Sequence, residues 1–338
     1  MTNFKEYFRH HLKINIRPII YILVAVLVFT FLIGINNQTY KHLDYDTGKW
    51  ITEYCSTLYI PVIVVCALAY VLPVQEFSFF KKRITLDCVY SLPISRRAMG
   101  IVHYLTGLII LFGAFTASYL LNFASLLLWG PGIYNFSPMI GHYFLCLLLG
   151  FSMYSVMAFV FNRANTKGDG IWFMILYTFV FVLIVAAYVN ITENWVISDD
   201  VYGAISWGVI ARMTTVYQRV VEFETGSIVA LWKQPEFVSW FAFWVLAGIA
   251  SAVGLFFTFG KRRMEKTEEI SDSYFGFRTL IPTFAITGMI TFEVSDSIIL
   301  WVIIELFAIL GYTIYRRGFH YKKSDIAILC ILLIFLFV

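Results

Sequence analysis

Long apolar runs, separated by short polar segments, make up most of this chain. Eight of them approach or exceed the roughly 20 apolar residues that an α-helix needs to cross a bilayer. They lack the alternation of apolar and polar residues over about ten positions that marks an outer-membrane barrel strand. The pattern therefore predicts an all-α polytopic membrane protein, with spans at 18–35, 54–74, 99–128, 139–161, 170–189, 237–260, 279–294 and 297–315.

The final apolar run, 326–338, is too short for a simple assignment. As a helix its 13 residues would cover about 20 Å, whereas the hydrocarbon core is about 30 Å thick. Three arrangements stay open: a short ninth span, a tail in the membrane interface, or a helix buried between others. The seventh run is also short, and a half-span stays open there.

The composition supports a membrane protein and excludes several other classes. Hydrophobic residues make up 60% and charged residues 14% of the chain, against about 25% charged in soluble domains. The five cysteines form no C-x-x-C pair, so neither a disulfide framework nor a zinc site is indicated. The sequence contains no Walker A, H-E-x-x-H or G-x-S-x-G motif. We therefore expect no catalytic function, no cofactor bound by this chain and no nucleic-acid partner.

Lysine and arginine positions predict the orientation in the membrane. With the N-terminus in the cytoplasm, 20 of the 25 lysine and arginine residues fall in inner segments. The outer segments then keep only five: Lys41, Lys49, Arg212, Arg219 and Lys233. A single topology thus agrees, in every loop, with the preference of lysine and arginine for the cytoplasmic side.

The polar segments predict the organisation of the chain. In residues 1–17, Phe4, Phe8 and Leu12 form an apolar stripe beside basic residues, which suits a helix lying among lipid headgroups. Residues 18–260 form a six-span domain. Residues 261–338 add a charged connector, 261–273, and a C-terminal membrane hairpin.

Two further features concern a transport pathway. In the outer segment 190–236, Arg212 and Arg219 lie on the polar face of an amphipathic helix. That helix could lie on the outer surface, dip back over the exit of a pathway, or pack over the bundle.

Glu305 is near the middle of the eighth span, where a charge costs about 2.5–3.5 kcal/mol. A pathway carboxylate and a hydrogen-bonded structural residue both stay open.

A dense polar and basic segment, 75–97, lies between the second and third spans. Phe77, Phe79 and Phe80 could anchor a short helix parallel to the membrane surface, with 81–83 (KKR) pointing to water or headgroups. A cytoplasmic partner that gripped this helix would move both spans together. A simple positive-inside loop is the alternative interpretation.

This segment resembles the loop between spans two and three of bacterial ABC transporter permeases of the type-2 exporter class. The similarity comprises an aromatic-basic stretch from Glu76 to Arg83, then Asp87, then Tyr90-Ser91-Leu92-Pro93, then Arg96. Tyr90 stands where a histidine is common. The six-span core, the N-terminal surface helix and the outer helical segment also match, so the resemblance covers about residues 1–260.

The resemblance implies a permease subunit without an ATPase of its own, in a bacterial cytoplasmic membrane. Its partners would be a second permease copy, in a homodimer or heterodimer, cytoplasmic ATPase subunits that bind ATP and Mg²⁺, and membrane lipid. The residues that would couple it to the ATPase are Glu76, Phe77, Phe80, Lys81, Arg83, Asp87, Tyr90 and Arg96. The candidates for the pathway are Glu305, Arg212 and Arg219.

Exporters of this class carry peptides, lipids, glycans or drugs. Aromatic residues make up 19% of the chain and buried charge is sparse, which favours a hydrophobic or amphipathic cargo. A secondary carrier, a membrane sensor and an assembly factor, all without an ATPase partner, are the alternatives. In a sensor or an assembly factor, the segment 75–97 would bind a different partner. A secondary carrier would be expected to show inverted repeats and paired ionisable residues, and the sequence shows neither.

Overall fold

A computed structural model describes residues 3–34, 39–43, 50–54, 59–83, 94–129, 136–193, 235–260, 267–271, 273–292 and 298–335. Apart from turns and connecting segments, these residues are helical, as predicted, with one short antiparallel hairpin. The hairpin consists of β1 (Thr39–Leu43) and β2 (Trp50–Tyr54), with Leu43 opposite Trp50. It lies between the first two predicted spans, where the hydropathy pattern did not indicate strands.

Six helices in the described part of the chain are long and apolar enough to cross a bilayer. They correspond to the first six predicted spans: α2 (Ile16–Gly34), α3 (Tyr59–Phe77), α5 (Arg96–Trp129), α6 (Phe136–Arg163), α7 (Lys167–Glu193) and α11 (Pro235–Phe259). The 34 residues of α5 make a helix about 50 Å long, which exceeds the hydrocarbon core as the sequence predicted.

Three more helices follow α11. They are α12 (Phe277–Phe292), α13 (Ile298–Arg316) and α14 (Lys323–Phe335). They confirm helices at the seventh and eighth predicted spans, although neither is among the six candidate spans in the described residues. The 16 residues of α12 cover only about 24 Å, which is short for a complete crossing.

Contacts within the chain define two compact units. Unit 1 comprises Met1–Leu72, Ala98–Ser155 and Ser206–Ala250. Unit 2 comprises Pro73–Arg97, Val156–Ile205 and Ser251–Val338. The C-terminal helices therefore belong to the same unit as α7.

Close helix packing in unit 1 depends on a glycine and on hydroxyl groups. Tyr154 on α6 lies against Gly107 on α5, where a Cβ would come within 2.0 Å of the tyrosine hydroxyl. Tyr104 and Ser155 hydroxyl oxygens lie 2.6 Å apart in the same contact. The absence of a side chain at Gly107 lets a buried tyrosine lie against bare helix backbone, as small residues commonly do in membrane bundles.

A helix, α1 (Asn3–Ile14), forms in the segment where the N-terminal surface helix was predicted. Its Tyr7 hydroxyl lies 3.3 Å from His103 Nε2 on α5, and the rings of His11 and His103 are 4.0 Å apart. His103 is buried. Contacts with α5 therefore hold α1 in unit 1, in addition to any attraction to lipid headgroups.

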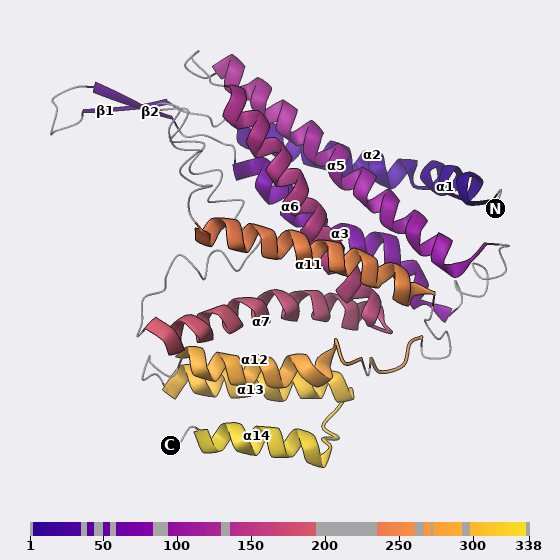
Figure 1. Ribbon diagram of the computed structural model, residues 1–338, viewed down its shortest axis with the longest axis vertical. Coiled ribbons are helices and arrows are strands. Elements are labelled where there is room, and N and C mark those ends of the chain that lie inside the picture. Colours follow the sequence, from indigo (N-terminus) through magenta and orange to yellow (C-terminus); the bar gives the residue numbers. More distant parts are fainter. Residues whose placement is uncertain are drawn as a thin grey trace. The chain divides into compact units, whose positions relative to one another are not determined.

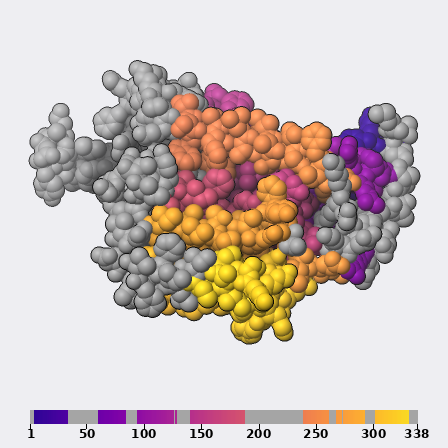
Figure 2. All heavy atoms as spheres, turned by 60° about the horizontal axis from the view of Figure 1, so that its bottom comes forward, coloured from indigo at the N-terminus to yellow at the C-terminus, as the bar shows by residue number. Residues whose placement is uncertain are grey.

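In unit 2, α7, α12, α13 and α14 lie side by side (Figure 1). The ring centroids of Phe173 and Phe277 are 4.8 Å apart, which joins the second turn of α7 to the first turn of α12. Phe277 also contacts Tyr315 at 5.7 Å, and Phe284 contacts Phe307 at 6.5 Å, so α13 runs antiparallel to α12. Figure 2 shows α14, in yellow, at the surface of this unit.

Candidate functional site

The predicted coupling segment is described only in part. It includes the end of α3, the 3₁₀ helix η1 (Ser78–Lys81) and the start of α5. η1 covers only the start of the short helix predicted at 76–92, and residues 84–93 lie outside the described residues. Four predicted site residues lie outside the described residues: Asp87, Tyr90, Arg212 and Arg219.

Aromatic contacts fix η1 within unit 2. The ring centroid of Phe80 is 5.0 Å from that of Phe259, at the end of α11, and Phe77 is 6.1 Å from the same ring. Phe77 and Phe80 are both buried. Burial of a phenylalanine contributes about 1.5–3 kcal/mol, so these two side chains hold η1 firmly against α11. We expected them at the membrane interface, and they are instead part of the protein core.

Lys81 corrects a second expectation. The sequence predicted that it would point to water or headgroups, but it is 2% exposed. Its Nζ donates to the carbonyl oxygens of Phe161, at 2.9 Å, and Ala164, and it lies 5.0 Å from the Phe161 ring. The last carbonyls of a helix have no intrahelical partner, so a lysine that reaches them stabilises the helix end. Lys81 thus caps the C-terminus of α6.

Arg83 links the same segment to the connector that precedes α12. Its Nε donates to the Thr267 carbonyl at 2.9 Å, and its backbone N–H donates to Glu268 Oε1 at 3.2 Å. The Arg83–Glu268 ion pair, at 3.8 Å, is about half exposed on both sides, so it contributes little by itself. Its hydrogen bonds to backbone and carboxylate fix the course of the chain after η1.

The connector also binds the turn between α6 and α7. Ser271 Oγ accepts a hydrogen bond from the Asn165 backbone N–H at 2.7 Å and donates to Asp169 Oδ2 at 2.5 Å. At the end of α13, Arg317 Nη2 donates to the Glu268 carbonyl at 3.4 Å. We call this set of links the polar junction: Lys81, Arg83, Phe161, Ala164, Asn165, Asp169, Thr267, Glu268, Ser271 and Arg317.

Sequence reasoning identified only Lys81 and Arg83 of the polar junction. Asn165, Asp169 and Ser271 were missed, although the polar turn 162–170 and the charged connector were both noticeable as loops. The signal that pairs them is spatial, since Ser271 and Asp169 are separated by 102 positions. The junction's groups bond one another, which suits a mechanical link between helix ends rather than a reaction centre.

Two other predicted residues lie away from η1 in the chain. Arg96 is exposed in the first turn of α5. Glu305 is half-buried on α13, and its Oε2 has no hydrogen-bond partner among the described residues. Twelve residues, about 18 Å along the helix, separate Glu305 from Arg317 at the polar junction. Among the described residues, Glu305 thus lies away from the polar junction along α13.

Within unit 1, the imidazole rings of His11 and His103 lie close together, with their centroids 4.0 Å apart. Two imidazoles are fewer than the three or four protein ligands of a zinc site. Among the described residues of unit 1, this pair alone is therefore short of a zinc ligand set.

No protein-family model matches this chain, and no curated protein and no solved structure shows a match. The fold and the polar junction are therefore the basis on which function is assigned. They establish a helical protein with six candidate membrane spans among its described residues.

Proposed function

We propose that this chain is the transmembrane permease subunit of an ATP-driven ABC exporter in a bacterial cytoplasmic membrane, with its N-terminus in the cytoplasm. A separate cytoplasmic ATPase would bind ATP and Mg²⁺ and supply the energy. A second permease copy would complete the transporter. The cargo would be hydrophobic or amphipathic, such as a peptide, lipid or drug.

The observation that carries this proposal is the anchoring of η1. Lys81 holds it to the C-terminus of α6, Phe80 holds it to the end of α11, and Arg83 holds the following residues to the connector. A packed core and short hydrogen bonds transmit displacement because they deform little. A push on η1 would therefore move α6, α11 and the connector together, which is what a coupling element must do.

The same geometry revises which residues a partner would touch. Glu76, Phe77, Phe80 and Lys81 are buried, so they position η1 and do not offer a surface. Phe79 is 39% exposed, and Lys82 and Arg83 are exposed. We propose that an ATPase contacts Phe79 and the two basic side chains.

The test is co-purification of an ATPase with the tagged chain from its native membrane in a mild detergent. We expect ATPase activity in the purified complex. Lys82→Glu should reduce the co-purified activity at least about tenfold, because placing a like charge against a complementary surface costs several kcal/mol. The variant should still insert in the membrane at the normal level, since Lys82 is exposed.

Lys323→Glu is the matched control. Lys323 is also an exposed lysine of unit 2, in the first turn of α14, and the same charge reversal there should leave the co-purified activity unchanged. Equal activity in wild type and Lys82→Glu would reject the coupling surface. A chain that purifies without ATPase would overturn the exporter and favour a secondary carrier or a membrane sensor.

A further inference from the structure

Unit 2 contains an apolar cavity of about 350 Å³ between α7, α12 and α13. On each helix the lining residues follow the first of them by three, four or seven positions in the sequence. This spacing places their side chains in a single stripe along one face of the helix. The ends of the three stripes are Trp172 and Phe179 on α7, Phe277 and Phe284 on α12, and Phe307 and Ile314 on α13.

The three stripes lie at the same level along the helices. Phe277 contacts Phe173 and Tyr315, and Phe284 contacts Phe307, so the antiparallel α13 is in register with α12. In each helix seven residues separate the two ends of the stripe, a rise of about 10 Å. The cavity is therefore an elongated slot that runs along the helices from the end marked by Trp172, Phe277 and Ile314.

Every residue that lines the slot is apolar. Several lining side chains, among them Phe179, Phe307 and Leu310, are more than half exposed, so the slot opens at the surface of the unit. An apolar surface of this kind favours an apolar occupant. A peptide segment is a poor occupant, because its backbone N–H and C=O groups would find no hydrogen-bond partner there. A hydrocarbon chain carries no such groups and suits a slot of this form.

Basic and aromatic side chains mark the end of the slot. Arg278 directly follows Phe277, is exposed, and lies 5.0 Å from the ring centroid of the exposed Tyr274. Lys167 is exposed at the start of α7. Tryptophan, tyrosine and basic residues gather at the level of lipid headgroups, and basic pockets between membrane helices bind anionic headgroups.

The described acidic residues nearest in the chain to Lys167 and Arg278 are Asp169, Glu268 and Glu269. Asp169 accepts a hydrogen bond from Ser271 Oγ, Glu268 pairs with Arg83 at 3.8 Å, and Glu269 is exposed on the connector. Arg278 and Lys167 are exposed cations near this end of the slot, where a phosphate would meet them.

We propose that the slot binds one acyl chain of an anionic phospholipid, with the headgroup phosphate at Arg278 and Lys167. The occupant is a lipid of the leaflet that faces the basic end of α7 and α12. This site does not depend on the proposed transport function, since it uses neither η1 nor the polar junction.

The experiment measures phospholipid retained by the purified full-length chain, by native mass spectrometry, after equilibration with vesicles of phosphatidylglycerol and phosphatidylcholine in equal amounts. Wild type should retain phosphatidylglycerol in preference. Arg278→Gln should lower that preference about fivefold. Leu310→Trp places a large ring in the slot and should abolish retention of both lipids.

Leu306→Trp is the matched control for Leu310→Trp. Both leucines are on α13 and are similarly exposed, at 53% and 54%, but only Leu310 lines the slot. Leu306→Trp should retain lipid as wild type does. Equal retention in the two tryptophan variants, or no preference for phosphatidylglycerol in wild type, would overturn the proposal.

A second measurement does not depend on the folding of a variant. Phosphatidylglycerol with a photoreactive group on its acyl chain should label wild-type peptides that contain 172–179 and 307–314. Labelling confined to other helices, or to residues of unit 1, would contradict an occupied slot.

Discussion

Three consecutive basic residues, Lys81, Lys82 and Arg83, have different environments although their sequence character is the same. Lys81 is buried on the carbonyls at the end of α6, Lys82 is exposed, and Arg83 bonds the connector. η1 ends at Lys81, and Lys82 has an extended backbone at φ −116° and ψ 128°. Successive side chains of extended backbone point to opposite sides, so one residue of a basic run can face the core while its neighbour faces solvent. The presence of several basic residues in a row therefore does not predict which lysine is buried and hydrogen-bonded within the protein.

Lys81→Met is expected to destabilise the protein by about 2 kcal/mol, the usual range for losing hydrogen bonds to a charged group. Methionine keeps a long apolar side chain beside Phe161, but it leaves the Phe161 and Ala164 carbonyls without this donor. The midpoint of thermal unfolding in detergent should fall by several degrees.

Lys82→Met provides the comparison for this change. It removes a neighbouring exposed charge and should alter stability by no more than about 0.5 kcal/mol. If both variants unfold at the same temperature, Lys81 does not cap α6 in solution.

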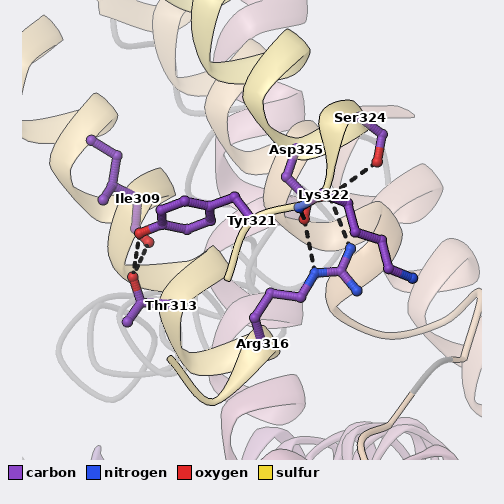
Figure 3. Close-up of polar contacts among 7 residues, drawn as sticks. All are labelled: Ile309, Thr313, Arg316, Tyr321, Lys322, Ser324 and Asp325. Atoms are coloured by element: carbon purple, nitrogen blue, oxygen red, sulfur yellow. Dashed lines mark hydrogen bonds and ion pairs between the residues drawn. The ribbon is translucent and has the colours of Figure 1, made fainter. Parts of the chain in front are cut away.

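At the scale of elements, α14 shows how a helix of 13 residues is held in place. The chain leaves α13 through a Schellman motif, with Gly318 N–H donating to the Thr313 carbonyl at 3.0 Å and Arg317 in a left-handed conformation at φ 54°. It then returns so that the Tyr321 hydroxyl lies 2.8 Å from Thr313 Oγ1 (Figure 3). α14 packs on α13 and α12, but Ile326 is 48% exposed and Cys330 is exposed, so α14 is not a helix buried between others. A short ninth span and a tail in the interface both stay open for 326–338.

An ion pair closes this return. Arg316 donates to both oxygens of Asp325, at 2.8 and 3.0 Å, and the Lys322 backbone N–H donates to Asp325 at 3.1 Å (Figure 3). Asp325 is the third residue of α14 and bonds back to the N–H at its N-cap, as in a capping box. Burial raises the pKa of Asp325, but these hydrogen bonds outweigh it and hold the pKa below its ordinary value.

Asp325→Asn should therefore lower stability in a pH-dependent way. Because the pKa is lower in the folded chain, the stabilisation is fully present above the unfolded value of about 3.9 and is lost as pH falls through the folded value. The difference in thermal midpoint between wild type and variant should be constant from pH 7 to about pH 5. It should shrink below about pH 4.

Glu269→Gln is the control for the loss of a carboxylate, since Glu269 is exposed on the connector. This variant should unfold like wild type at pH 7. A difference for Asp325→Asn that grows on acidification would contradict the assigned sign of the pKa shift.

At the scale of the whole molecule, the distribution of basic residues predicts which loops face the cytoplasm. In a chain whose five cysteines are replaced by serine or alanine, Arg212→Cys should react with a membrane-impermeant maleimide in intact cells. Lys323→Cys should react only after the cells are opened. The reverse pattern would invert the proposed orientation, and the mass shift of the labelled chain reports it directly.

Hydropathy and charge determined a large part of this protein. The six candidate spans agree with the first six predicted spans, because a long apolar run in water-free surroundings must satisfy its backbone hydrogen bonds as a helix. The excess length of α5 also followed from a local count of apolar residues. These properties belong to single segments, so the sequence is sufficient to predict them.

Only the tertiary structure decided what each polar residue does. Lys81 bonds a carbonyl 80 residues away, and Arg83 bonds one 184 residues away. The slot between α7, α12 and α13 needs three faces that no single segment contains. Hydropathy sums one segment at a time, whereas a hydrogen bond or a cavity depends on which distant segments meet, and that is set by the packing of the whole unit.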